Sequence, residues 1–147
     1  MEQFQKIESL GLTDKYYDLC NEYPLRVGTP VEKMSSREVL KAADGRVSIQ
    51  KLKGPGTCYE VQDIPDSVLL RFIIQSRTRV ETHLQVQGLE REYVSSFATL
   101  CLAAREAAGK ERPTPPYPRP EVHSVNELIE VFTRLRDLAL EIDRGGQ

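Results

Sequence analysis

Two runs of alternating apolar residues, both within residues 67–88, constrain the fold more than any other part of the chain. The apolar side of the alternation consists of Val68, Leu70, Phe72, Ile74, Val80, Thr82, Leu84 and Val86. The opposite side carries mainly charged and amide groups and consists of Leu69, Arg71, Ile73, Gln75, Arg79, Glu81, His83, Gln85 and Gln87. Because successive side chains of a strand point to opposite faces, this pattern predicts β-structure with one buried and one polar face.

The segment between the two runs, residues 75–79, contains no apolar side chain and predicts a hairpin turn. A single long bent strand is the alternative interpretation. Two shorter segments, residues 46–53 and 57–63, also alternate and are joined by a Lys-Gly-Pro-Gly turn. Four strands joined by short turns predict an antiparallel meander, one face of which has to be covered.

Two C-terminal segments have the helical spacing of apolar residues and are predicted to cover that face. The first spans residues 89–108 and ends before Gly109, a residue type that is favoured just beyond a helix. The second begins at a capping box formed by Ser124 and Glu127, and its apolar stripe continues to the glycines at 145 and 146.

Two short helices are predicted closer to the N-terminus. Residues 13–23 form the first, with Thr13 as the N-cap, and residues 35–43 form the second, with a capping box of Ser35 and Glu38. The predicted fold is therefore α+β and a single domain, residues 1–147. It is a four-stranded antiparallel meander with two C-terminal helices packed on one face and short N-terminal helices.

The charge balance and the cysteines restrict the functional classes. Lys and Arg number 20 against 22 Asp and Glu, and the formal charge of −2 argues against a general nucleic-acid binder. The three cysteines are far apart and form no CxxC pair, as expected for a reduced cytosolic protein. Neither a signal-peptide pattern nor an apolar run of ~18 residues occurs, so we expect a cytoplasmic protein without a membrane span.

The chain contains no recognisable catalytic, metal-binding or nucleotide-binding motif. Only His83 and His123 are available as bases near neutral pH, and neither lies in a nucleophile motif. No cluster of Cys, His and acidic residues has the spacing of zinc ligands, and no glycine-rich phosphate loop occurs. We therefore expect a non-enzyme without metal or cofactor. A small hydrolase that uses one of the two histidines is the least favoured alternative.

Two features are candidates for binding a protein partner. The first is the polar strand face, whose candidate contact residues are Arg71, Gln75, Arg77, Arg79, Glu81, His83 and Gln85. The second is a segment with five prolines, residues 112–120, in which Tyr117 and Arg119 are the candidate contacts. A solvated strand face and a rigid linker are the corresponding structural interpretations.

Three stretches in this order of elements carry a family resemblance: LLRFIIQSRTRVETHLQV, AAREAAG and PPYPRPEVHSVNELIEVF. Over residues 45–143 the chain resembles the small immunity proteins encoded beside bacterial polymorphic toxins. The resemblance implies a cytosolic non-enzyme that binds one cognate toxin domain and blocks its active site or substrate access. These families share no binding motif, so the resemblance assigns no residue. The near-neutral charge argues against a nuclease as the toxin. A secretion or adaptor chaperone that holds an effector segment is the alternative function.

Overall fold

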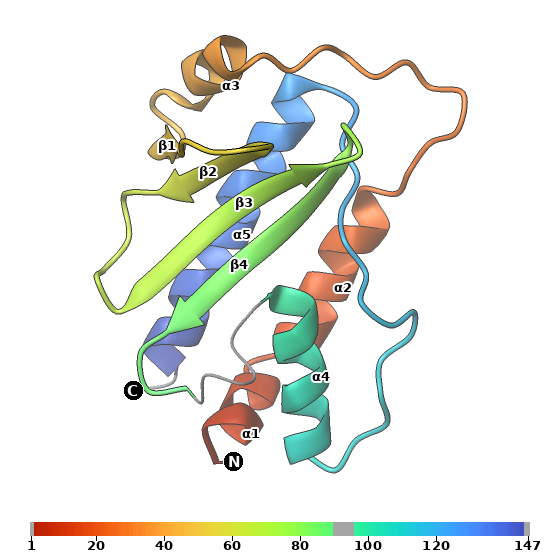
Figure 1. The fold of residues 1–147 in the computed structure, drawn as a ribbon. Helices are drawn as coiled ribbons and strands as arrows, with labels where there is room; N and C mark the ends of the chain where they lie inside the picture. Colours follow the sequence, from red (N-terminus) through yellow and green to blue (C-terminus); the bar gives the residue numbers. More distant parts are fainter. Residues whose placement is uncertain (1, 90–95, 146–147) are drawn as a thin grey trace.

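A computed structural model describes residues 2–89 and 96–145 of the chain. Four strands form one antiparallel sheet in the order β1-β2-β3-β4. They are β1 (Ile49–Lys51), β2 (Thr57–Val61), β3 (Val68–Gln75) and β4 (Arg79–Val86). Sequence neighbours are also neighbours in the sheet, which confirms the predicted meander (Figure 1).

Gln75 and Arg79 are paired with each other, and the β3–β4 hairpin turns over the three residues between them. This register confirms the predicted turn and excludes one long bent strand. Ser76 and Arg77 have φ angles of 52° and 69°, in the left-handed region that is unfavourable for residues with a Cβ atom. The turn therefore depends on contacts from neighbouring segments as well as on its own sequence.

The described residues also form five helices: α1 (Glu2–Ser9), α2 (Leu12–Glu22), α3 (Ser36–Ala43), α4 (Phe97–Ala107) and α5 (Val125–Gly145). The predicted N-cap residues of α3 and α5 are confirmed, because the Ser35 hydroxyl accepts from the Glu38 N–H and the Ser124 hydroxyl accepts from the Glu127 N–H. The second half of the capping box at α5 differs from the prediction, because the Glu127 carboxylate accepts from the N–H of His123 and not from that of Ser124. Helix α1 was not among the elements predicted from the sequence.

The predicted N-cap of α2 is wrong. Gly11, with a φ of 82°, occupies that position, and Thr13 lies inside the helix. The reason is the tight connection from α1, which requires a left-handed residue at Gly11 and starts the next helix at Leu12. The buried Thr13 hydroxyl instead donates to the Glu8 carboxylate at 2.7 Å.

Helix α4 starts later than the periodicity suggested. Its N-cap is Ser96, whose hydroxyl accepts from the Thr99 N–H at 3.1 Å. The part of the prediction that covers residues 90–95, with Tyr93 and Val94, lies outside the described residues. Gly109 follows the helix with a φ of 68°, as expected for a residue just beyond a helix end.

Helix α5 lies across the apolar side of the sheet, which we call the inner face. Its Phe132 ring stacks on Phe72 with centroids 4.1 Å apart and contacts Tyr59 at 5.8 Å. Helices α1, α2 and α4 pack together beside β4, where Tyr16 stacks on Phe97 at 5.5 Å. The opposite side of the strands, the outer face, carries none of these helices (Figure 1). The described helices thus leave one face of the sheet uncovered.

Candidate protein-binding surface

A row of polar side chains crosses the outer face from one edge of the sheet to the other. The strand register places Gln50, Glu60, Arg71 and His83 side by side on the four strands. Arg71 Nε donates to Glu60 Oε2 at 2.8 Å, and both side chains are partly exposed. This ion pair fixes the guanidinium group on the open face without removing it from solvent.

Apolar side chains flank this row on the same face. Leu69 and Ile73 precede and follow Arg71 by two positions in β3, and both are half-buried. The Cys58 thiol is half-buried beside Ile73 in the register, and burial raises its pKa. The outer face therefore combines a fixed charge pair with an uncovered aliphatic strip.

The proline-rich segment runs beside the edge of the sheet, and one of its side chains reaches the outer face. We call residues 112–122 the strap; they lie between α4 and α5 and meet the sheet at the first residues of β4, beside the hairpin turn (Figure 1). Arg119 Nη1 donates to Gln75 Oε1 at 3.3 Å and lies 3.6 Å from the Glu81 carboxylate. Its guanidinium group also lies 5.1 Å from the centre of the Tyr117 ring. The structure thus joins the two candidate features into one surface.

Hydrogen bonds hold the strap in place on both sides. The Val80 N–H donates to Pro120 O at 3.0 Å, and the Val122 N–H donates to Thr78 O at 2.8 Å, so the strap extends the sheet at this edge. From α2, the Tyr16 and Tyr17 hydroxyls donate to strap carbonyl oxygens at 2.8 and 2.6 Å. The strap is therefore held by β4 and by α2, and it presents the exposed Tyr117 ring.

A buried carboxylate that sequence reasoning missed anchors the strap. Glu121 is 8% exposed, accepts from the Thr78 hydroxyl, and accepts from Arg79 Nε at 3.0 Å. These contacts brace the left-handed turn at the end of the β3–β4 hairpin. The only sequence signal was an acidic residue between Pro120 and the apolar Val122, which does not identify its partners.

The candidate residues therefore divide into two groups. Glu81 is buried, with its Oε1 accepting from the Thr82 N–H at 2.8 Å, and Arg79 is paired with Glu121. These two side chains hold the strap. Arg79 nevertheless keeps part of its side chain open to solvent. The other candidates with at least part of their side chain open to solvent are Arg71, Gln75, Arg77, His83, Gln85, Tyr117 and Arg119.

The two histidines have different surroundings. His123 is buried, its Nε2 accepts from the Arg26 N–H at 3.2 Å, and its backbone N–H donates to Glu127 Oε1 at 2.9 Å. Burial opposes ionisation of Glu127, but hydrogen bonds from Arg26 and from the backbone of His123 outweigh it and lower the pKa of the Glu127 carboxyl. His123 thus holds the loop after α2 in place. Within residues 2–89 and 96–145, neither histidine is hydrogen-bonded to a Ser, Thr or Cys side chain.

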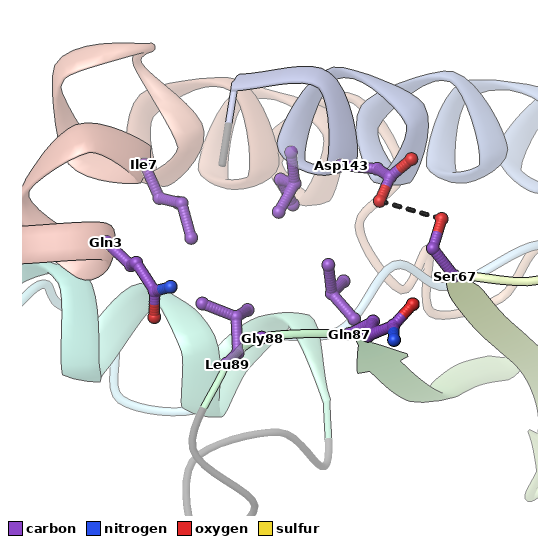
Figure 2. A pocket seen from close by; sticks show the side chains of 9 residues that line it. Gln3, Ile7, Ser67, Gln87, Gly88, Leu89 and Asp143 are labelled. Atoms are coloured by element: carbon purple, nitrogen blue, oxygen red, sulfur yellow. Dashed lines mark hydrogen bonds between the residues drawn. The ribbon is translucent and has the colours of Figure 1, made fainter. Parts of the chain in front are cut away.

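A small cavity of about 170 Å³ lies at the other end of the sheet, where Ile7, Val86 and Leu89 contribute apolar walls. Figure 2 shows the Ser67 hydroxyl beside the buried Asp143 carboxylate, to which it donates at 3.0 Å. The cavity adjoins Leu89, after which the described part of the chain is interrupted. Among the described residues that line it there is no histidine or cysteine.

The described part of the chain contains no group of three or more His, Cys, Asp or Glu side chains that could hold a metal ion. Among the described helices, none combines the length and apolar character needed to cross a membrane. In comparison with known proteins, no family model matches the chain, and no curated protein or solved structure is significantly similar to it.

Proposed function

We propose that this protein binds a folded protein partner through the outer face of its sheet and the adjoining strap. The observation that carries the proposal is a sheet face on which none of the described helices packs, where Arg71 is fixed by Glu60 beside the half-buried Leu69 and Ile73. Side chains held on a rigid sheet lose little entropy on binding, and the Arg71 guanidinium offers directional donors. The exposed Tyr117 ring adds the kind of aromatic side chain that is enriched in interfaces.

We propose further that the partner is a bacterial toxin domain and that the protein is its cytosolic immunity protein. Support for this comes from the sequence resemblance and from the absence of a recognisable catalytic motif in the sequence. In this function the protein acts by covering the toxin's active site or substrate path. A near-neutral inhibitor does not offer the acidic surface that would complement a nuclease, so the proposed target is a toxin of another class.

The chaperone alternative is less well supported, because holding an extended segment by strand addition requires an open edge strand. β1 has only three residues and presents the exposed Lys51, a combination that disfavours pairing with another chain. The first part of β4 is already paired with the strap through Pro120 and Val122.

The test is co-expression in bacteria with the toxin-like domain encoded beside this gene, scored by growth and by copurification. We expect growth rescue and a one-to-one complex. The double variant Arg71→Glu/Ile73→Asp should weaken the affinity by about 2 kcal/mol, which is ~30-fold. The matched control is Arg37→Glu, an exposed charge reversal on α3 that should retain full affinity. Unchanged affinity in a correctly folded double variant would remove the outer face from the proposal.

A further inference from the structure

A second cavity, of about 200 Å³, lies at the hairpin end of the sheet. Its walls come from the loop residues 32–34, from α3, from the ends of β2 and β3, and from the first turns of α5. In Figure 1 this is the end of the sheet near α3 and the start of α5. All the residues that line this cavity are within the described ranges.

The deep part of this cavity is apolar. Val39, Tyr59 and Leu128 are at most 1% exposed, and Met34 and Ile74 are half-buried beside them. An engineered apolar cavity of ~150 Å³ in another protein binds benzene. The space is therefore sufficient for one aromatic ring or one branched aliphatic side chain.

The lining also includes basic groups that have no partner. Lys33 and Arg77 are exposed and make no hydrogen bond or ion pair with any other described residue. Glu32 is the one acidic residue in the lining, so the charge there is positive by one unit. The Glu32 N–H donates to His123 O at 2.8 Å, which fixes this wall of the cavity. A ligand with an apolar body and one carboxylate complements both the floor and the rim.

We propose that this cavity binds an aromatic or branched apolar side chain that lies next to a carboxylate, presented by the protein partner. Arg77 connects the cavity to the outer-face surface, because it belongs to the hairpin turn that the strap braces. The biological role of the cavity rests on the proposed function. Binding of a free carboxylate ligand does not require the partner, and the two proposals can therefore fail separately.

The two methionines of the chain provide a simple probe of the cavity, because Met34 lines it and Met1 is at the N-terminus. Protein labelled with ¹³C at the methionine methyl groups is titrated with phenylacetate and, separately, with its neutral analogue phenylacetamide. We expect a saturable shift of the Met34 methyl signal with phenylacetate, with a Kd of about 1–5 mM for a ligand of this size. The Met1 signal should not move. Phenylacetamide should bind about 3- to 10-fold more weakly.

Two variants separate the roles of charge and shape. Lys33→Gln/Arg77→Gln should reduce phenylacetate binding to the level of the amide and leave amide binding unchanged. Lys6→Gln on α1, an exposed lysine that does not line this cavity, is the matched charge control. Ile74→Phe fills the cavity and should abolish binding of both probes. If it does not fold, Thr57→Leu serves the same purpose from the neighbouring strand.

Two results would overturn the cavity proposal: no saturable Met34 shift with either probe, or equal affinities for the acid and the amide. Loss of toxin binding with intact phenylacetate binding would contradict only the proposed function. Toxin binding that persists without any probe binding would contradict only the cavity proposal.

Discussion

The two faces of the sheet differ in burial, although both arise from one alternating pattern of apolar and polar residues. On the inner face, Leu70 and Leu84 are completely buried and Phe72 stacks on Phe132 of α5 at 4.1 Å. On the outer face, the neighbouring Leu69 and Ile73 stay half-buried, and Glu60 is the hydrogen-bond partner of the Arg71 side chain among the described residues. The comparison shows that alternation creates two faces, whereas the placement of the helices decides which of them is closed.

Because of this difference in burial, we expect substitutions on the two faces to affect different properties of the protein. Contacts on the inner face exclude water completely, so their loss is expected to reduce the free energy of unfolding strongly. Contacts on the outer face remain in partial contact with solvent, so their loss should have small effects on stability and larger effects on partner binding.

The largest expected difference comes from one substitution made at two adjacent positions of β3. Leu70→Ala should lower the free energy of unfolding by about 2–5 kcal/mol, because it removes a fully buried side chain and leaves a cavity. Leu69→Ala should cost less than about 1 kcal/mol, because that side chain is half-exposed on the other face. Urea unfolding monitored by circular dichroism measures both values. Similar losses for the two variants would contradict the assignment of an open outer face.

The second comparison uses a buried thiol and a thiol on the open face. Burial raises the pKa of Cys101 on α4 from 9.0 to about 12, whereas burial only partly desolvates Cys58 on the outer face. Between pH 9 and about pH 12, Cys101 loses its proton in the unfolded chain but keeps it in the folded chain. The contribution of this thiol is thus fully present below pH 9 and is lost as the pH rises towards 12.

We therefore expect Cys101 to make the free energy of unfolding fall with pH by about 1.4 kcal/mol per unit in this window. The measurement is urea unfolding at a series of pH values for the wild type, Cys101→Ala and Cys58→Ala. The Cys101 variant should show the shallower pH dependence, and the Cys58 variant should stay close to the wild type. Identical slopes in all three proteins would show that Cys101 titrates normally in the folded state.

The smallest expected effect on stability concerns the ion pair between Glu60 and Arg71. A double-mutant cycle with Glu60→Gln and Arg71→Gln should give a coupling energy of about 0.2–1 kcal/mol, because both side chains are partly exposed. The coupling should decrease further at 1 M salt. A coupling well above this range that does not respond to salt would mean that the outer face is more closed than its side-chain exposure indicates.

Much of the fold follows from patterns within short stretches of sequence. The alternation of β3 and β4, the turn between them and the capping residues Ser35 and Ser124 all predict the structure that is found. The N-cap of α2 was predicted wrongly, because the connection from α1 is fixed by the backbone of Gly11. Thr13 has the residue type of an N-cap, but in the folded protein its hydroxyl donates to the Glu8 carboxylate.

The candidate surface was predictable only in parts. The alternation identified Arg71 and His83 as members of one face, and the proline content identified the strap as a rigid segment. The sequence did not show that Glu81 is buried under Arg119, nor that Glu121 holds the hairpin turn. These contacts join residues that approach one another only after the sheet and the strap have packed.

By itself, the sequence determined the two-faced strands, the order of the elements and the absence of a recognisable catalytic motif. Only the tertiary structure decided which face stays open, that Arg119 of the strap reaches it, and that a cavity forms beside Arg77. The physical reason is distance along the chain. Periodicity and capping depend on residues a few positions apart, whereas Gln75 and Arg119 are 44 positions apart and meet only through packing.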